Sequence, residues 1–382
     1  MSAGLVRDSW KALKALASRR VEIRCEGIPY RFEKVPLKKL LNWILVEASL
    51  YVKPDRPWGL PTHLQVEPTN RCNLKCALCP VASGLDRPSG SMDLDFFKRM
   101  IDETEGSVFL VLLWNWGEPF FNPRAFDMIA YARDRGIRIV SSTNGHLFAH
   151  GEKAEKVVRS GLDTIIFAVD GITQESYERY RCGGSLETVL DGIRNVVQQK
   201  RRLKSKTPLI NFRFIVMKDN EHEIPAVKEL ARSLGVDVLT FKTLNPGFNH
   251  GTAPVHDNQC IPENERYRRF VYRENGRGRI RNKNNPCKNL WNCPVIHWSG
   301  VICSCCNDPH QRHAVGDLRS DSFPNNWSGE LYRRMRGRFR QDWDELPLCR
   351  DCTNAFKGGS AYDETVAETI YFTPVQDAEA SN

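Results

Sequence analysis

The sequence predicts an α/β protein in which helices cover a parallel sheet and a small cysteine-rich domain follows. Three observations lead to this fold class. Between residues 62 and 241, apolar runs with strand character alternate with segments of helical periodicity. Small, polar and charged residues follow the first four strands, which is typical of the active face of a parallel sheet. Finally, three cysteines gather at 72–79 and seven lie between 287 and 352.

Six apolar runs are predicted as strands. They span residues 63–68, 107–114, 137–143, 163–170, 209–217 and 236–244. The run SVFLVLLW at 107–114 is continuously apolar, as expected for a buried parallel strand. Five helices are predicted between the strands, at 93–104, 123–136, 151–161, 185–202 and 223–235. Repeated strand–helix units form a parallel sheet, which can stay open or curve into a full or partial barrel.

The segment before the first strand is predicted to contain a single clear helix. In LKKLLNWILVEASLYV, at 37–52, apolar residues recur at helical spacing, which indicates a packed helix or, alternatively, a membrane-surface or partner helix. The run contains Lys38, Lys39 and Glu47 and is too short and too charged to span a bilayer. The N-terminus has no secretory signal, so we expect a cytoplasmic protein without a transmembrane segment.

Composition indicates a globular chain of 382 residues, 41% hydrophobic and 26% charged, with a net charge of +9. Much of the basic excess lies in ERYRRFVYRENGRGRIRNKNNPCK, at 265–288. This segment is interpreted as a solvated basic surface, with a site for an anionic substrate or a nucleic acid as the alternative. No known nucleic-acid motif accompanies it, so nucleic-acid binding is not predicted.

Thirteen cysteines in a chain without an export signal favour metal binding or catalysis over disulfides. Cys25, Cys182 and Cys260 lie outside both groups and are interpreted as ordinary thiols. The first group, Cys72-x3-Cys76-x2-Cys79, provides three ligands. A structural zinc site usually has four, and a 4Fe–4S cube held by three thiolates leaves one iron open to a small chelating ligand.

This cysteine spacing, after a first strand and the residues EPTNRCN, resembles the radical S-adenosylmethionine (radical SAM) superfamily over roughly residues 60–245. The resemblance implies a partial (β/α)6 TIM-like barrel. It also implies that Cys72, Cys76 and Cys79 hold a 4Fe–4S cluster whose open iron binds S-adenosylmethionine. A zinc knuckle is the alternative reading of the three thiols.

Further segments resemble the cosubstrate-binding motifs of this superfamily. WGEP, with Gly117 and Glu118, resembles the Gly-Gly-Glu segment that binds the methionine amino group, although Trp116 stands where the first glycine is usual. The resemblance also implies roles near the ribose, the methionine carboxylate and the adenine. These roles fall to Asn144, Asp170, Arg181 and Val216, the last in a segment that also contains Asn220.

The second cysteine group resembles the SPASM/twitch extensions of radical SAM enzymes, which carry auxiliary 4Fe–4S clusters. Cys287, Cys305, Cys349 and Cys352 are the ligands that this resemblance implies for one auxiliary cluster. No cysteine follows Cys352, which is the pattern of the short, single-cluster form. A structural zinc ribbon is the alternative, because four thiolates suit both metals. The roles of Cys293, Cys303 and Cys306 stay open.

The resemblance implies reductive cleavage of S-adenosylmethionine to a 5′-deoxyadenosyl radical, which abstracts a hydrogen atom from the substrate. With the auxiliary cluster as electron acceptor, we expect a net oxidation of a small, sugar- or cyclitol-like molecule, possibly anionic. The electron donor would be a flavodoxin or ferredoxin. Alternatives are a redox-neutral reaction, a peptide-modifying maturase and a non-catalytic zinc protein that binds nucleic acid. Candidate bases are Lys242, His250, His256 and His297.

These predictions divide the chain into five parts. They are an N-terminal helical extension at 1–60, a radical SAM partial barrel at 61–245, a linker and basic segment at 246–284, a SPASM/twitch-like domain at 285–360 and a C-terminal tail at 361–382.

Overall fold

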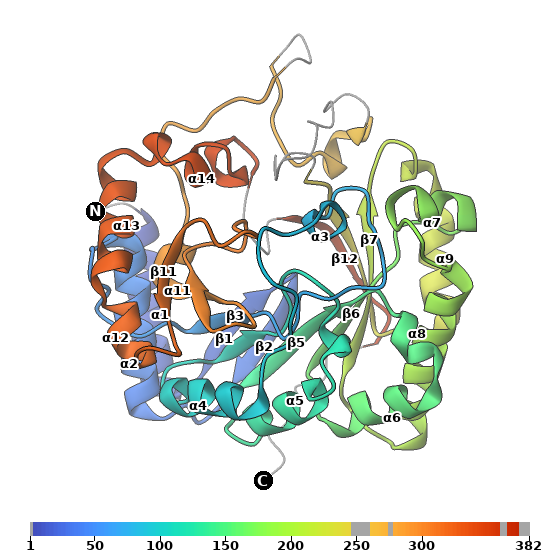
Figure 1. The fold of residues 1–382 in the computed structure, drawn as a ribbon, viewed down its shortest axis with the longest axis horizontal. Coiled ribbons are helices and arrows are strands. Elements are labelled where there is room, and N and C mark those ends of the chain that lie inside the picture. The colour runs from blue at the N-terminus through green and yellow to red at the C-terminus, as the bar shows by residue number, and fades with distance from the viewer. Residues whose placement is uncertain (1–2, 246–259, 274–277, 360–364, 374–382) are drawn as a thin grey trace.

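The computed structural model describes residues 3–245, 260–273, 278–359 and 365–373, and every structural statement below refers to these residues. One curved ten-stranded sheet has the order β11-β10-β9-β3-β4-β5-β6-β7-β8-β12 (Figure 1). The six predicted strands form its centre, and each pairs in parallel with the next from β3 to β8. The predicted α/β class with a parallel barrel-like sheet is therefore confirmed.

The strands are β1 Val21–Cys25, β2 Ile28–Phe32, β3 His63–Val66, β4 Leu110–Leu112, β5 Arg138–Thr143, β6 Thr164–Ala168, β7 Leu209–Val216, β8 Val238–Thr243, β9 Val295–Ile296, β10 Val301–Cys303, β11 Ala314–Asp317 and β12 Val366–Tyr371. The helices are α1 Ala3–Ser18, α2 Leu37–Val52, α3 Pro80–Ser83, α4 Leu94–Thr104, α5 Ala125–Arg133, α6 Gly151–Arg159, α7 Gln174–Tyr180, α8 Leu186–Arg202, α9 Ile224–Leu234, α11 Asn289–Asn292, α12 Phe323–Trp327, α13 Glu330–Asp342 and α14 Pro347–Arg350.

The main core lies between the sheet and the helices on its convex side. Alternate residues of each strand point to this side, and Ile165, Phe212 and Phe241 are fully buried there. The covering helices α4, α5, α6, α8 and α9 follow the outside of the sheet in Figure 1. Several begin at a side-chain cap: Asp93 accepts hydrogen bonds at the start of α4, and Ser185 does so at the start of α8.

The N-terminal segment contains more structure than the single helix predicted from the sequence. A helix, α1, and a hairpin of β1 and β2 precede α2. Alternate residues of β1 are buried, so the hairpin has the period expected of a half-buried strand. It packs against the inner face of the sheet, where the Tyr30 hydroxyl donates to Thr164 Oγ1 at 2.8 Å. The hairpin is therefore a separate two-stranded sheet that packs against the inner face of the barrel sheet.

The predicted helix at 37–52 is present as α2, but only one side of it is packed. Leu40 and Val46 are fully buried, whereas Leu37, Leu41 and Leu45 are exposed. No helix among the described residues is both long enough and apolar enough to cross a membrane.

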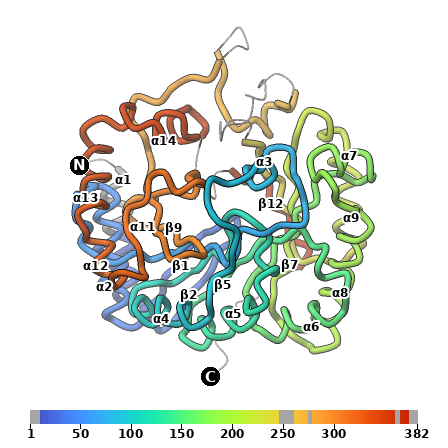
Figure 2. Tube along the Cα trace, viewed as in Figure 1, coloured from blue at the N-terminus to red at the C-terminus, as the bar shows by residue number. Residues whose placement is uncertain are grey.

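The C-terminal region continues the central sheet. β9 pairs in parallel with β3, and β10 and β11 follow in antiparallel order. Figure 2 shows α12 and α13 on the same side as α2, and hydrogen bonds from Trp327 Nε1 to the Gly59 carbonyl and from Arg336 Nη1 to the Asp55 carbonyl join these parts. The cysteine-rich region is thus attached to the barrel by main-chain pairing and side-chain contacts.

The predicted C-terminal tail contains a strand. β12 pairs antiparallel with β8 and forms the far edge of the sheet. Its first five residues are partly exposed and the last, Tyr371, is exposed. Burial therefore does not alternate along the strand, and no period of two marks it as a strand.

The basic segment is only partly a solvated surface. The Arg279 guanidinium lies 4.2 Å from the centre of the Phe270 ring, and Arg281 lies over the rings of Trp343 and Phe356. These arginines stack on aromatic side chains of the C-terminal region, which is a common use of the flat guanidinium group.

Candidate active site

The three cysteines of the first group lie on the loop after β3. The Leu74 amide donates to Cys72 Sγ at 3.4 Å, and the Cys79 amide donates to the Cys76 carbonyl at 3.0 Å. Burial is the largest cause that raises the pKa values of Cys72 and Cys79 to about 11, and neighbouring cysteines of the group contribute to this rise. The thiols of the loop are therefore within electrostatic range of one another.

The loop is held against the segment after α7. The Lys75 amide donates to the Cys182 carbonyl and the Ala77 amide to the Tyr180 carbonyl, each at 3.0 Å. Between these positions, Arg181 Nη1 lies 3.7 Å from Cys76 Sγ.

Arg181 is oriented by Asp170, which follows β6. The Arg181 Nε and Nη2 atoms each lie 2.6 Å from Asp170 Oδ2, and the carboxylate is fully buried. The other oxygen, Oδ1, accepts from the Ile215 amide at 2.7 Å. A buried, hydrogen-bonded carboxylate of this kind fixes the guanidinium beside the cysteine loop.

Glu118 joins the same site from the segment after β4. Its carboxylate accepts from the Thr143 hydroxyl and the Asn144 amide, each at 2.8 Å. Burial raises the pKa of Glu118 to about 7, although these hydrogen bonds oppose the rise. Asn144 extends the network, because its Nδ2 donates to Asn73 Oδ1 at 2.8 Å and lies 3.8 Å from Cys72 Sγ.

Gly117 allows a close approach of two backbones. Its φ is +110°, and a Cβ atom there would lie 2.5 Å from the Thr69 carbonyl oxygen. A side chain cannot fit at this position, which explains why glycine stands here even though Trp116 replaces the preceding one.

Val216 occupies a different environment. Its side chain is fully buried in the core between the sheet and the helices, and no contact given for the described residues joins it to the three cysteines. Asn220, in the same segment, bonds the Asp170 and Ile215 carbonyls through Nδ2 and so fixes the loop after β7.

The four predicted cysteines of the second group also come together. Cys287 precedes α11, Cys305 follows β10, and Cys349 and Cys352 lie in and just after α14. Burial raises the pKa values of Cys287 to about 11 and of Cys352 to about 12, with a smaller contribution from the Cys305 thiol in both cases. The pKa of Cys349 is raised more strongly. Burial is the largest cause, followed by Cys287, Cys352 and Cys305.

The donors of both groups are thiols, which are the ligands that iron–sulfur clusters use. Zinc requires its sulfur ligands within about 2.3 Å of one point. Within the described ranges, no group of three or more His, Cys, Asp or Glu side chains converges in this way. Thiolates that bind the separate irons of a cube lie further apart, and none of the thirteen cysteines, all of them described, forms a disulfide.

The three remaining cysteines differ in their surroundings. Cys293 is buried in the cluster of apolar residues on the inner face of the sheet. Cys303 is fully buried and hydrogen-bonded to Asp308. Cys306 forms a hydrogen bond with Cys305, and this contact is the first cause of the raised pKa of Cys305. Cys306 therefore lies at the second group without belonging to the four.

The two candidate bases among the described residues, Lys242 and His297, lie in different surroundings. Lys242 pairs with Glu26 at 2.9 Å. His297 was expected near the barrel mouth, but it is fully buried with Nδ1 3.3 Å from Glu67 Oε2. It joins the barrel to the second cysteine group because Glu67 follows β3 and His297 follows β9. His250 and His256 lie outside the described residues.

Sequence reasoning missed two residues that link the cysteine sites, Glu67 and Arg87. Arg87 Nη1 and Nη2 donate to the two oxygens of Glu67 at 2.8 and 2.7 Å, and Arg87 Nε donates to the Pro309 carbonyl at 2.6 Å. Both side chains are almost completely buried. His297 and Arg87 outweigh the effect of burial and lower the pKa of Glu67. The cysteine loop separates Glu67 from Arg87 in the sequence, so no local sequence pattern predicts that they pair.

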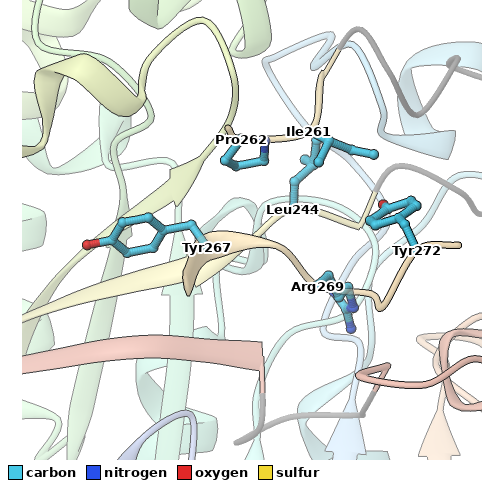
Figure 3. A pocket seen from close by; sticks show the side chains of 6 residues that line it. All are labelled: Leu244, Ile261, Pro262, Tyr267, Arg269 and Tyr272. Carbon is cyan, nitrogen blue, oxygen red and sulfur yellow. The ribbon is translucent and has the colours of Figure 1, made fainter. Parts of the chain in front are cut away.

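A small cavity lies between β8 and the basic segment (Figure 3). Its volume is about 10 Å³. It is lined by Leu244, Ile261, Pro262, Tyr267, Arg269 and Tyr272. A cavity of this size holds no more than one water molecule, so it is not itself a substrate site.

Comparison with known proteins places these features in a family. Residues 66–241 match the model of the radical SAM superfamily, and residues 287–353 match that of an iron–sulfur cluster-binding domain, SPASM. The chain is 26% identical over 323 residues to the tungsten-containing aldehyde ferredoxin oxidoreductase cofactor-modifying protein of Pyrococcus furiosus, covering 76% of this chain and 87% of that protein. It is 23% identical to the PqqA peptide cyclase of Gluconobacter oxydans, covering 76% and 82%.

A third relative matches over about half of its own length. The AdoMet-dependent heme synthase of Methanosarcina barkeri is 32% identical over 176 residues, which cover 46% of this chain and 48% of that protein.

Solved structures show the same fold. Streptococcus suis SuiB bound to S-adenosylmethionine superposes with a TM-score of 0.58 at 14% identity, covering 91% of this chain and 82% of that one. The protein anSMEcpe, with bound AdoMet and a peptide, gives 0.53 at 15% identity, covering 78% and 92%. Both matched domains imply 4Fe–4S clusters, and the first implies S-adenosylmethionine as cosubstrate. The chain therefore belongs to the radical SAM superfamily and carries a SPASM iron–sulfur cluster-binding domain after its barrel.

Proposed function

We propose that this protein is a radical SAM enzyme that removes two electrons from a small, carbohydrate-like substrate. In this proposal Cys72, Cys76 and Cys79 hold the first 4Fe–4S cluster. The set Cys287, Cys305, Cys349 and Cys352 holds one auxiliary cluster. The observation that supports this division is the number of thiols: three in the first set and four in the second, with thiols of each set within electrostatic range of one another.

When bound, S-adenosylmethionine and the clusters would supply the one-electron chemistry: removal of a hydrogen atom from the substrate to the 5′-deoxyadenosyl group, then transfer of the second electron to the auxiliary cluster with loss of a proton to solvent. The residues of the chain bind and orient. Arg181, held by Asp170 beside Cys76, suits the methionine carboxylate. Glu118, where ionised, suits the amino group. Asn144 supports the loop through Asn73.

The N-terminal hairpin supports a small substrate. Glu26, at its turn, is buried and bonded to Arg213 and Lys242 on the inner face of the sheet. A segment held in this way occupies the interior of the barrel, which reduces the room available to a large substrate. An external flavodoxin or ferredoxin would supply the first electron.

Peptide modification is the second candidate. It is favoured by the match with PqqA peptide cyclase over most of both chains and by the fold shared with SuiB, which has also been solved bound to its precursor peptide SuiA. The two candidates differ in whether a peptide changes the rate of S-adenosylmethionine cleavage.

The test is anaerobic reconstitution followed by addition of S-adenosylmethionine and dithionite, with 5′-deoxyadenosine measured by chromatography. We expect about eight irons per chain, as two four-iron clusters require, and formation of 5′-deoxyadenosine. Cys76→Ala should abolish this product and leave about four irons at the auxiliary site. Product formation by Cys76→Ala at the wild-type rate would disprove the assignment of the first site.

A further inference from the structure

The inner face of the sheet changes in character between its two halves. On β4, β5 and β6, four apolar residues of this face pack against the hairpin: Leu110, Leu112, Val140 and Ile166. On β7 and β8 the same face carries four polar or cationic residues beside the apolar Val238: Asn211, Arg213, Thr240 and Lys242. All four lie at alternate positions of their strands, so they point to one side of the sheet.

The cations of this polar half share one carboxylate. Arg213 Nη1 donates to Glu26 Oε2 at 2.5 Å, and Lys242 Nζ donates to the same oxygen at 2.9 Å. Glu26 and Arg213 are almost completely buried, whereas the Lys242 side chain is 22% exposed. Lys242 is therefore the cation of the pair that a molecule inside the barrel can reach.

A third cation lies close to these two. Arg269 and Leu244, the residue after the end of β8 at Thr243, line the same small cavity (Figure 3). Burial is the largest cause that lowers the pKa of Lys242, and Arg213 and Arg269 lower it further. Burial lowers the pKa of Arg269 to about 10, and Glu26 opposes this change. Arg213 and Lys242 carry two positive charges beside the single carboxylate of Glu26.

Asn211 adds a hydrogen-bond donor to the same face. Its Oδ1 accepts from the Thr240 hydroxyl at 2.9 Å. Its Nδ2 is buried and has no hydrogen-bond partner among the described residues. Buried amide groups are rarely left in this state, so an acceptor at this place would satisfy the donor.

Building on the proposed function, we propose that Lys242, Arg269 and Arg213, together with Asn211, form a subsite for an anionic group of the substrate. A carboxylate or a phosphate has the required charge and acceptor oxygens. Glu26 orders Arg213 and Lys242 in the absence of the anion. Binding here would direct the rest of the substrate toward the space between the two cysteine sites.

The opposing explanation is that the ion pairs only attach the hairpin to the barrel. The two explanations predict opposite results for Glu26→Gln. Loss of this carboxylate raises the net charge of the subsite by one unit, so an anion should bind more tightly. If the ion pairs serve only to attach the hairpin, the variant loses stability and gains no affinity for anions.

The experiment uses the anaerobically reconstituted holoenzyme with S-adenosylmethionine in excess, so that the site of its own carboxylate is filled. Inorganic phosphate and malonate are titrated separately by calorimetry, and the tighter of the two identifies the anionic group. We expect Lys242→Gln and Arg269→Gln each to weaken binding about tenfold, the loss of one charged hydrogen bond. Glu26→Gln should tighten it.

Lys228→Gln and Arg268→Gln are matched controls. Lys228 pairs with Glu368. Arg268, which precedes Arg269 in the sequence, pairs with Glu265. Both should leave anion binding unchanged. Equal binding by wild type, Lys242→Gln and Arg269→Gln would overturn the proposal, as would the absence of binding of either anion to wild type. If Glu26→Gln does not fold, the two cation variants decide the question.

Formation of 5′-deoxyadenosine in the same samples separates this proposal from the proposed function. If S-adenosylmethionine is cleaved but no anion binds, only the proposed subsite is disproved. If anion binding depends on Lys242 and Arg269 but the protein forms no 5′-deoxyadenosine, the proposed reaction is disproved instead.

Discussion

The two cysteine sites of this protein use different surroundings for similar ligands. The first site has three thiols on one loop, with the charged groups Arg181 and Glu118 beside them. The second has four thiols from three separate segments, and burial is the largest cause of the raised pKa values of Cys287, Cys349 and Cys352. A site that binds a charged cosubstrate needs polar groups around a free position, whereas a site that only exchanges electrons is complete with its own ligands.

Loss of a ligand at the second site gives the largest expected effect and tests its independence from the first. Cys349→Ala should reduce the iron content from about eight to about four per chain, because a cluster with four protein ligands loses one of them. S-adenosylmethionine should still be cleaved. Iron analysis and the 5′-deoxyadenosine assay check this, with Cys182→Ala, outside both groups, as the control. An unchanged iron content would contradict the assignment.

Arg87→Met tests the connection between the sites. It leaves Glu67 without its bidentate partner in a fully buried position, which should cost about 3–5 kcal/mol of stability. Thermal unfolding of the holoenzyme measures the loss, and the magnetic interaction between the two reduced clusters measures any change in their separation.

Arg312→Met is the control at the same interface, because Arg312 pairs with Asp86 where both side chains are exposed. A fall in stability as small as that of Arg312→Met would show that the buried pair is not what joins the two regions.

Asp170→Asn should weaken the binding of S-adenosylmethionine at the first site without removing a cluster ligand. Arg181 keeps a neutral partner but loses the charge that orients it, so S-adenosylmethionine should bind about tenfold to a hundredfold more weakly. Equilibrium binding and iron content together check this prediction, since the iron content should not change. Arg179→Gln, which removes a surface pair with Glu175, is the control. Equal affinity in Asp170→Asn would exclude a role of this pair in binding.

Glu118→Gln tests the polar character of the first site through pH. The pKa of Glu118 is raised to about 7, so the carboxyl is mostly neutral at pH 6 and mostly ionised at pH 8. A cationic amino group binds better to the ionised form. Affinity for S-adenosylmethionine should therefore rise up to about tenfold between these values in the wild type. The amino group of the cosubstrate titrates nearby, so the measured quantity is the difference between wild type and Glu118→Gln, and identical pH profiles would refute the role.

The sequence predicted the central sheet because its strands are long apolar runs separated by amphipathic helices. It predicted both cysteine groups because their spacing is local. The hairpin at 21–32 was missed although alternate residues of VEIRC are apolar, since five residues form a weak pattern. β12 was missed because its residues are neither buried nor alternating.

The pairs Arg87–Glu67 and Glu26–Arg213 could not be predicted for another reason. Each joins residues that only the folded sheet brings together, and a single arginine or glutamate in a sequence is usually a surface residue. Val216 was assigned from the resemblance alone. Its side chain is part of the hydrophobic core, and its role beside the adenine stays a prediction.

The last strand has a consequence for how the protein is made. β12 completes the sheet beside β8, and the Tyr371 hydroxyl donates to the Gly27 carbonyl at the turn of the N-terminal hairpin. The turn that enters the barrel is thus in contact with residues translated more than three hundred positions later. The hairpin turn can therefore reach its final contacts only after β12 has paired with β8.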